Sequence, residues 1–368
     1  MRLLDRYLLR ELLVPLAYCL GGFLIFYCSF DLINRISFFQ DNHLRFLDCL
    51  EYYLTLMPDL LVLLLPVALL LGLLYALANH ARHQELTAMR AAGVSLWRLA
   101  LPYFGVGLVF ALVVFALGEW VAPVAAEQSE FILGRRVGAP QDRNWKSPVN
   151  FQNEPEGRTW RIQRFNLVTG EMIEPFVDWK KADGSEVQIY AERAFYANRE
   201  WTFTHAGEWD TAPGAPAPVF KTNVVLRMDF AERPEMIRAD LRISNLKAEQ
   251  AAKRPQFSIA QITQYLAMHP QVEARQRAML ETQWQGRLAE PVKCLMVVLI
   301  ALPFGAQSGR RNVFVGVASS IFIVFSYFVL QRLSLASGTG QYLPPVLAAW
   351  LPNVVFGVVG LVLAARMR

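Results

Sequence analysis

Titratable side chains gather in one short polar stretch, residues 79–99 (NHARHQELTAMRAAGVSLWRL). His80 and His83 are three residues apart, so a helix would place both on one face, and Glu85 follows them. Imidazole and carboxylate are ligand types of a zinc site. The pair has no third ligand at a recognisable spacing, however, and polar residues are expected where an apolar run ends. The sequence therefore predicts no metal ion here.

Motifs that would make the chain an enzyme are missing from the sequence. It contains no G-x-x-x-x-G-K-[ST] loop for nucleotide phosphates and no strand-linked G-x-G-x-x-G. It also contains no H-E-x-x-H and no G-x-S-x-G. We therefore expect no catalytic residue and no cofactor bound by this chain. If ATP energy is used, another subunit must hydrolyse it.

The polar stretch also has a helical pattern. A helix over its middle is expected to end at Gly93, because glycine suits the first position beyond a helix, and a new helix is expected to begin at Ser95. A short helix with one carboxylate and small or apolar neighbours could insert into a cleft on a cytosolic partner. An ordinary bend at the membrane surface is the alternative. The residues by themselves leave these two interpretations about even.

Long apolar runs lie on both sides of this stretch and make up much of the first and last thirds of the chain. Hydrophobic residues make up 54% of the 368 residues and charged residues only 18%. Each run is about the ~20 residues that a helix needs to cross a ~30 Å hydrocarbon core. The runs lie near residues 12–33, 56–78, 100–122, 289–307, 313–331 and 344–364. The pattern predicts a mixed membrane protein with six transmembrane helices, three on each side of one inserted domain.

Arginines mark the orientation of these spans. They precede the first span and separate the second from the third and the fourth from the fifth, and they close the chain: Arg2, Arg6, Arg10, Arg82, Arg90, Arg98, Arg310, Arg311, Arg366 and Arg368. Loops rich in arginine stay in the cytoplasm. Both termini are therefore expected in the cytoplasm, and the inserted domain on the far side, in the periplasm of a cell with two membranes. The arginines form no basic stripe, so nucleic acid is not an expected partner.

The inserted block changes to a period of two. Alternating segments at 160–165, 187–192, 201–204 and 224–230 predict strands. Turns are expected at Thr169-Gly170, Asp183-Gly184, Ala206-Gly207 and 212–218. Short alternating strands with tight turns favour an antiparallel β domain, a sandwich or open barrel.

These patterns divide the chain into four parts. Residues 3–13 are amphipathic and predict a helix on the inner membrane surface that leads into the first span. Residues 258–288 return to a polar helical pattern, interrupted at Pro270, and form a connector. The predicted parts are an N-terminal membrane half at 1–123, the β domain at 124–257, the connector at 258–288 and a C-terminal membrane half at 289–368.

Three strings give the chain a family resemblance. ELTAMRAAGVSLWRL at 85–99 resembles the inward loop of the lipopolysaccharide-export permeases, the LptF/LptG family. GEWVAP at 118–123 and LDRY at 4–7 are similar to the LptG type, which makes the chain closer to LptG than to LptF. The layout of three spans, a β-jellyroll and three spans matches the family over essentially the whole chain.

The resemblance implies a half-permease of an ABC exporter in the bacterial inner membrane. Two such subunits, LptF and LptG, would pair above a dimer of the cytosolic ATPase LptB. Lipopolysaccharide would enter between the first span of one subunit and the fifth of the other, then pass to the β domains and on to the periplasmic bridge proteins LptC and LptA. The ATPase-coupling helix would comprise Glu85, Leu86, Met89, Arg90 and Gly93.

The residues that would contact the lipid depart from the family pattern. LptG-type members carry lysines near the outer end of the first span, which engage lipid phosphates. Here the stretch is DLINRISFFQDNHLR, with Asp31 where a base is expected and Arg35, Phe38 and Arg45 as the candidates for lipid contact. Either a partner supplies more positive charge, or the glycolipid carries fewer phosphates.

The leading hypothesis is a permease subunit, itself without enzymatic activity, that exports lipopolysaccharide or a related glycolipid. The alternative is a membrane-anchored protein that assembles periplasmic partners without moving lipid. A scaffold of that kind would have no use for a helix that docks on an ATPase. A membrane enzyme acting on lipid is disfavoured, because no polar constellation at the membrane surface can be assembled from these residues.

Overall fold

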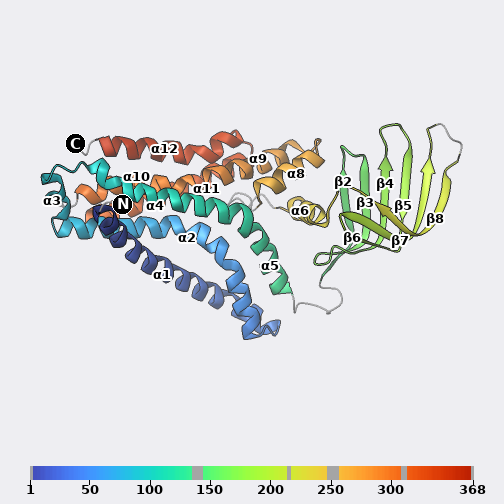
Figure 1. The fold of residues 1–368 in the computed structure, drawn as a ribbon, viewed down its shortest axis with the longest axis horizontal. Helices are drawn as coiled ribbons and strands as arrows, with labels where there is room; N and C mark the ends of the chain where they lie inside the picture. The colour runs from blue at the N-terminus through green and yellow to red at the C-terminus, as the bar shows by residue number, and fades with distance from the viewer. Residues whose placement is uncertain (1–2, 135–143, 214–216, 247–256, 308–312, 366–368) are drawn as a thin grey trace. The chain divides into compact units, whose positions relative to one another are not determined.

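The computed structural model describes residues 3–134, 144–213, 217–246, 257–307 and 313–365, and it divides into two compact units (Figure 1). The first, the helical unit, comprises Met1–Leu133, Ala248–Ser258 and Ala278–Arg368. The second, the β unit, comprises Gly134–Lys247 and Ile259–Arg277. Each unit has its own hydrophobic core.

The helical unit is built from long apolar helices. Its N-terminal elements are α1 (Leu3–Asp41), α2 (Phe46–Arg82), α3 (Glu85–Ala91), α4 (Leu96–Ala116), a π-helical turn (Leu117–Val121) and α5 (Ala122–Gly134). Its C-terminal elements are most of α9 (Ala274–Ala289), α10 (Val292–Gln307), α11 (Val313–Thr339) and α12 (Pro345–Ala365). The π-helical turn follows α4 without a break and leads directly into α5.

Among the described residues, five helices are long and apolar enough to cross a membrane: Leu3–Asp41, Phe46–Arg82, Trp97–Ala125, Ile321–Thr339 and Pro345–Ala365. The run at 289–307 forms the shorter helix α10, of 16 residues, because a turn at Glu290 and Pro291 separates it from α9. This short helix packs against α2, α4, α11 and α12. Where the sequence predicted six spans, the described residues therefore contain five helices of sufficient length and one shorter apolar helix.

The first helix differs from its expected form. The predicted surface helix at 3–13 and the first span join into the single helix α1, which continues through Pro15. Proline removes one backbone donor, and a helix in a membrane protein can continue when its neighbours compensate. Close packing against α2 accompanies this continuation: a Cβ on Gly72 would lie 2.9 Å from Cα of Leu16.

Burial is distributed unevenly between these helices. In the most apolar stretch of α2, 67% of the residues are buried inside the protein, against 11% for α1 and 28% each for α11 and α12. The core therefore centres on α2, α4 and α10. The outward faces of α1, α11 and α12 are apolar and need another apolar environment to cover them.

The β unit contains one sheet in which every pairing is antiparallel, as the fold prediction required. Its strands are β1 (Trp145–Lys146), β2 (Val149–Asn153), β3 (Arg158–Asn166), β4 (Met172–Lys180), β5 (Glu186–Tyr190), β6 (Arg193–Ala197), β7 (Glu200–Thr211) and β8 (Val219–Met228). The four predicted strand segments fall on β3, β5, β7 and β8. Within the described residues, the unit also contains α6 (Pro234–Ser244), α8 (Ile259–Met268) and the first residues of α9. A break between α8 and α9 lies at 269–273, around the predicted interruption at Pro270.

The sheet bends strongly because two of its strands change partners along their length. The start of β4 pairs with β6 and its remainder with β5, and β7 pairs first with β6 and then with β5. The bend closes around an aromatic core in which Phe151, Trp160, Phe165, Trp201 and Phe203 are almost fully buried.

One predicted turn is wrong. Ala206 and Gly207 lie inside β7, where Gly207 pairs with Tyr190 of β5 on one side and Thr222 of β8 on the other. The glycine signal arises instead from an irregularity within the strand, since His205 has a φ of 50° where β7 changes partners. Pairing with strands on both sides keeps the chain extended through this point.

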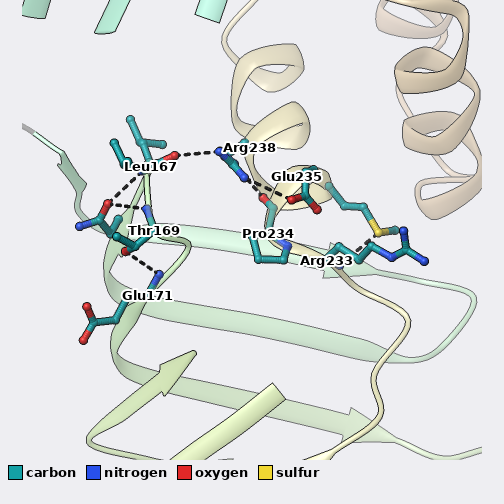
Figure 2. Close-up of polar contacts among 10 residues, drawn as sticks. Leu167, Thr169, Glu171, Arg233, Pro234, Glu235 and Arg238 are labelled. Carbon is teal, nitrogen blue, oxygen red and sulfur yellow. Dashed lines mark hydrogen bonds and ion pairs between the residues drawn. The ribbon is translucent and has the colours of Figure 1, made fainter. Parts of the chain in front are cut away.

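The turn between β3 and β4 anchors helix α6 (Figure 2). Within the turn, the side-chain oxygen of Asn166 accepts hydrogen bonds from the backbone N–H groups of Val168 and Thr169. Arg238 of α6 then donates from Nη1 to the carbonyl oxygen of Leu167 at 3.1 Å and from Nη2 to Glu235 at 3.4 Å. The predicted turn at Thr169-Gly170 is therefore confirmed, and it holds α6 against the sheet.

A buried ion pair lies beside the aromatic core. Glu232 is fully buried and accepts hydrogen bonds from Arg158 Nε at 2.7 Å and from Asn153 Nδ2 at 2.9 Å. The guanidinium of Arg158 lies over the ring of Phe230, 4.7 Å from its centroid. The backbone carbonyl of Glu232 accepts from the indole of Trp201 at 2.7 Å. Such a pair is costly to break, because each partner would be left buried and uncompensated.

Candidate functional site

Local sequence chemistry shapes the predicted coupling loop. Helix α3 begins after Gln84, which has a φ of 58°, and ends at a cap on Ala92. Gly93 then has a φ of 82°, and its N–H donates to the carbonyl of Arg90 while that of Val94 donates to Met89. These two bonds form a Schellman motif, which requires a positive φ and so favours glycine.

The next helix starts where the sequence predicted. Ser95 caps α4, and its hydroxyl accepts a hydrogen bond from the backbone N–H of Arg98 at 3.3 Å. Serine at this position satisfies one of the donors that a helix start leaves unpaired. The end of α3 and the start of α4 are therefore fixed by Gly93 and Ser95, two residues that were recognisable from the sequence.

The five residues predicted for the coupling helix have different surroundings. Leu86 is buried in the core of the helical unit, and Met89 is half-buried against that core. Arg90 and Gly93 are exposed, and Glu85 is partly exposed. The helix thus has an inner face that anchors it and an outer face that includes Thr87 and Ala88.

Glu85 is held by two side chains from other helices. Its two carboxylate oxygens accept from the hydroxyl of Tyr7 on α1 at 3.1 and 3.0 Å. Nδ1 of His80 on α2 lies 2.7 Å from one of the same oxygens. The rings of Tyr7 and His80 also meet, with centroids 5.7 Å apart. We name this cluster of Tyr7, His80 and Glu85 the coupling clamp.

Electrostatics of the clamp favour an ionised Glu85. Burial alone would raise the pKa of this carboxyl, but hydrogen bonds from His80 and Tyr7 outweigh burial and hold its pKa below the ordinary value. A negative carboxylate at this position also lies in the first turn of α3, where the helix dipole favours it. About a third of the side chain, 31%, is still exposed, so that a partner can reach it.

A second polar contact ties the same region together. Arg98 of α4 forms an ion pair with Asp5 of α1 at 2.8 Å. At the C-terminal cap of α2, the Nδ1 of His83 lies 2.9 Å from the backbone carbonyl oxygen of Asn79, and this side chain makes no hydrogen bond to Glu85 in the described part of the chain. Among the described residues, no group of three or more histidine, cysteine or acidic side chains is placed to hold a metal ion. The start of α1 is therefore bound by polar contacts to both α3 and α4.

The three candidates for lipid contact lie around the far end of the α1–α2 pair. Arg35 forms an ion pair with Asp31 one turn earlier on α1, at 3.0 Å, and its guanidinium lies over the ring of Tyr52 at 5.7 Å. Tyr53 of α2 donates to the same Asp31 at 3.3 Å. The charge of Arg35 is therefore largely compensated inside the chain.

The other two candidates are more accessible. Phe38 is 38% exposed on α1, close along the helix to Arg35. Arg45 is exposed at the N-terminal cap of α2, across the turn that joins the two helices. The structure thus gathers Arg35 and Phe38 on one helix and leaves Arg45 at the start of the next.

Sequence reasoning did not identify the partners of Glu85. His80 was weighed only as a metal ligand, and Tyr7 contributed only to the resemblance of the N-terminal string. The one available signal was His80 itself, a polar side chain near the end of a largely apolar helix, because such a side chain needs a hydrogen-bond partner when it is buried. His80 is fully buried in the structure, in agreement with that signal.

Comparisons with known proteins agree with this architecture. The family model described as "Lipopolysaccharide export system permease LptF/LptG" matches residues 6–366. The chain is 23% identical over 334 residues to the lipopolysaccharide export system permease protein LptG of Escherichia coli strain K12. The aligned region covers 86% of this chain and 84% of that protein.

Two further relatives give the same picture. LptG of Haemophilus influenzae is 22% identical over 82% of this chain and 81% of its own length. A protein of Rickettsia prowazekii, described as "Uncharacterized protein RP871", is 20% identical over 91% of both chains. Because the family match spans nearly the whole chain, this multi-pass membrane protein belongs to the LptF/LptG family of lipopolysaccharide export permeases.

Proposed function

We propose that the protein is one permease subunit of an ABC exporter that extracts lipopolysaccharide or a related glycolipid from the bacterial inner membrane. The observation that carries this proposal is helix α3, held from inside by the coupling clamp while its outer face is free to meet a partner. A separate cytosolic ATPase, similar to LptB, would bind that face and hydrolyse ATP. A second permease subunit, similar to LptF, would complete the membrane channel.

Arginine placement supports the orientation that this function needs. Arg82, Arg90 and Arg98 surround α3, and positive loops remain in the cytoplasm. Both termini and α3 would then lie on the cytoplasmic side, and the β unit in the periplasm. The ATPase and α3 would meet in the same compartment.

The outer face of α3 suits docking to a protein partner. Leu86 and Met89 fix the helix on the core, so that Thr87 and Ala88 project from a rigid base. Short helices with small outward residues fit into grooves on partner proteins. A movement of the ATPase would then act on α3 directly, and through the clamp on α1 and α2.

The apolar faces of α1 and α11 suit contact with lipid and with a second subunit. Phe26 and Phe30 stack on α1 with centroids 6.4 Å apart, and both are well exposed. Phe322 and Phe325 are similarly exposed on α11. We infer that lipid enters between α1 of one subunit and α11 of the other, where acyl chains replace bilayer lipid at little cost.

The polar head of the lipid would meet the outer end of α1. Because Asp31 compensates Arg35, this subunit offers less positive charge than the lysines of LptG-type members. Arg45 and a partner subunit would supply the remainder, or the glycolipid carries fewer phosphates. Phe38, exposed beside Arg35, would contact an acyl chain or the sugar face.

The β unit offers an edge for periplasmic bridge proteins similar to LptC and LptA. Strand β8 pairs only with β7 among the described residues. Its exposed residues include Val219, Phe220, Val224 and Val225. An unpaired strand edge with apolar side chains accepts a further strand from another protein, and the lipid would then be passed along this joined sheet.

The docking assignment is tested by Ala88→Arg, which adds bulk and charge to the outer face of α3 without touching the clamp. We expect it to abolish retention of the ATPase in a pull-down and to lower cell-surface glycolipid. Glu85→Arg should do the same, but it also breaks the clamp. Glu51→Arg, a reversal at an exposed carboxylate near the other end of α2, should leave retention of the ATPase unchanged. Normal ATPase binding by Ala88→Arg would refute the assignment.

The lipid route is tested by photocrosslinking from Phe38 to a labelled glycolipid. An exporter should give an adduct in the assembled complex, and the adduct should disappear on ATP turnover as the lipid leaves. A periplasmic scaffold that moves no lipid should give none. Crosslinking from Leu108 on α4, which is 53% exposed and lies on neither of the two proposed entry helices, controls for nonspecific labelling.

A further inference from the structure

The helical unit contains an apolar cavity of about 320 Å³ beneath the coupling loop. That volume lies at the lower end of the range for sites that bind small molecules, roughly 300–1,000 Å³. Its walls come from α1, α2, α4, α10 and α12, through residues that include Leu8, Leu77, Leu99, Leu302 and Ala364. Helix α3 forms part of the same wall through Leu86 and Arg90.

The mouth of the cavity differs chemically from its interior. Arg90, Ser95 and Trp97 line the cavity and are exposed, whereas the leucines deeper in the wall are buried. Arg90 makes no ion pair with any residue that the structure describes. Tryptophan beside a cation is the combination that proteins place at the level of lipid head groups. The site thus has an apolar interior and a positively charged rim.

A buried hydroxyl gives a second indication of a ligand. Tyr103 lines the cavity and is only 1% exposed, and its hydroxyl has no hydrogen-bond partner within the described part of the chain. A buried polar group without a partner is costly, and such groups commonly bond to a ligand or a water molecule. An ester or carbonyl oxygen of a bound amphiphile would accept from this hydroxyl.

We propose that this cavity binds one acyl chain of an anionic glycerophospholipid, with its phosphate at Arg90. The apolar walls match the acyl chain. The guanidinium of Arg90, which has no ion-pair partner among the described residues, matches a negative head group better than a zwitterionic one. The lipid would come from the cytoplasmic leaflet, a point that rests on the orientation proposed above. Binding itself does not depend on the transport function.

Occupancy would bear on the coupling helix. Leu86 lines the cavity and also belongs to the core of the helical unit, and Glu85 beside it belongs to the coupling clamp. A chain in the cavity would add contacts to the inner side of α3, beyond those that Leu86 makes with the core. The lipid would therefore act as a structural ligand of α3, distinct from the lipid that is exported.

The test uses the full-length protein in nanodiscs of phosphatidylcholine that contain phosphatidylglycerol with a diazirine at the end of one acyl chain. After illumination, peptides of α3, α4 and α12 are searched for adducts by mass spectrometry. We expect adducts on the walls of the cavity. Ala364→Phe, which fills the cavity, should reduce these adducts to background, whereas Leu361→Phe, on the exposed face of α12, should leave them unchanged. If Ala364→Phe does not fold, Leu302→Trp fills the same space.

The head-group assignment has its own variants. Arg90→Gln should lower the adduct yield about fivefold, as expected for the loss of one exposed charge pair, and should remove the preference over a phosphatidylcholine probe. Arg82→Gln, which removes an equal charge away from the cavity, should not. Adducts unaffected by both Ala364→Phe and Arg90→Gln would overturn the proposal. Loss of the adducts whenever the cytosolic ATPase is bound would assign the cavity to a side chain of that partner, and would also overturn it. Neither result depends on whether the protein exports lipid.

Discussion

The two units of this protein each hold a carboxylate among polar partners, with different consequences. In the β unit, Glu232 is fully buried and pairs with Arg158 beside an aromatic core. In the helical unit, Glu85 is bonded by Tyr7 and His80 but keeps 31% of its side chain exposed. Nothing outside the fold can reach Glu232, whereas a partner can reach Glu85. The first group serves the fold alone, and the second both fixes a helix and leaves it accessible.

The cores around the two carboxylates also differ, since one is closed and the other is open to its surroundings. The β unit closes on itself around large buried side chains such as Trp160 and Trp201. The helical unit buries α2 but leaves most of the apolar surface of α1 uncovered. A closed core supplies stability without help, and an open one depends on lipid or on another subunit. Breaking each network should therefore produce effects of different size.

The largest effect is expected from Arg158→Met, which leaves Glu232 buried and unpaired. The free energy of unfolding of the β unit should fall by about 3–5 kcal/mol. Unfolding of the full-length protein in detergent, followed by tryptophan fluorescence, measures this loss. Glu156→Gln removes only the exposed partner of the same guanidinium, 3.2 Å away, and should change little. Equal stability in Arg158→Met and the native protein would show that this pair does not hold the β unit together.

A smaller effect is expected at the crossing of α1 and α2. Gly72→Val places new atoms against the backbone of Leu16, where even a Cβ would be at 2.9 Å, and should destabilise the helical unit by about 1–3 kcal/mol. An SDS titration of the reconstituted protein provides the unfolding midpoint. Gly22→Val on the open face of α1 has space around it and serves as the control. If both variants unfold alike, the close approach does not contribute.

Tyr7→Phe tests the coupling clamp itself. It removes the hydroxyl that donates to Glu85 and should weaken the hold on α3 by about 0.5–1.5 kcal/mol. Hydrogen exchange of the α3 amides should accelerate, while that of the β unit stays unchanged. Tyr18→Phe, at a tyrosine of α1 that is 79% exposed, should have no such effect. Unchanged exchange in α3 would leave the hold to His80 alone.

The smallest effect concerns pH. Because the pKa of Glu85 is lowered in the folded protein, its contribution is complete above the ordinary value of about 4.3 and is lost only as the pH falls through the lower native value. Protection of α3 should therefore be constant from about pH 8 to about pH 5, after correction for intrinsic exchange, and decline below. Glu85→Gln should remove the decline. Loss of protection near neutral pH would contradict the assignment of the decline to Glu85.

The end of α3 and the start of α4 could be predicted because their chemistry is local. Gly93 and Ser95 act within one helical turn of their own positions, so the string contains the information. The partners of Glu85 could not be predicted in the same way. Tyr7 is separated from it by 78 residues, and only the packing of α1 against α2 brings the two together.

The lipid-contact region shows both situations at once. The pairing of Arg35 with Asp31 follows from their spacing of four residues on one helix, and it was available from the sequence. The stacking of Arg35 on Tyr52, and the bond from Tyr53 to Asp31, depend on a second helix. The sequence therefore predicted which residues lie at this end of α1 but not how far their charges cancel.

In the β unit, alternation located β3, β5, β7 and β8, since the first three have one face toward a closed core and Leu226 and Met228 of β8 pack against it. It failed at Ala206-Gly207, because a glycine signal is local while the strand is held by neighbours on both sides. The pair of Arg158 and Glu232 is 74 residues apart and had no signal at all. Periodicity thus predicted the strands, whereas the long-range polar contacts could be identified only from the folded structure.

The π-helical turn at Leu117–Val121 has a consequence for counting residues along the chain. Such a turn contains roughly one residue more than an α-helical turn, and one residue corresponds to a rotation of about 100° about the axis. The faces of α5 are therefore out of phase with those of α4. Ala122 and Ala125 of α5 are buried, and Val124 is 52% exposed. Which of these side chains points inward depends on that additional residue. Removing a single residue here would make the helix continuous and turn a different side of α5 inward, so a one-residue gap at this position in an alignment would mark a change of face rather than a change of length.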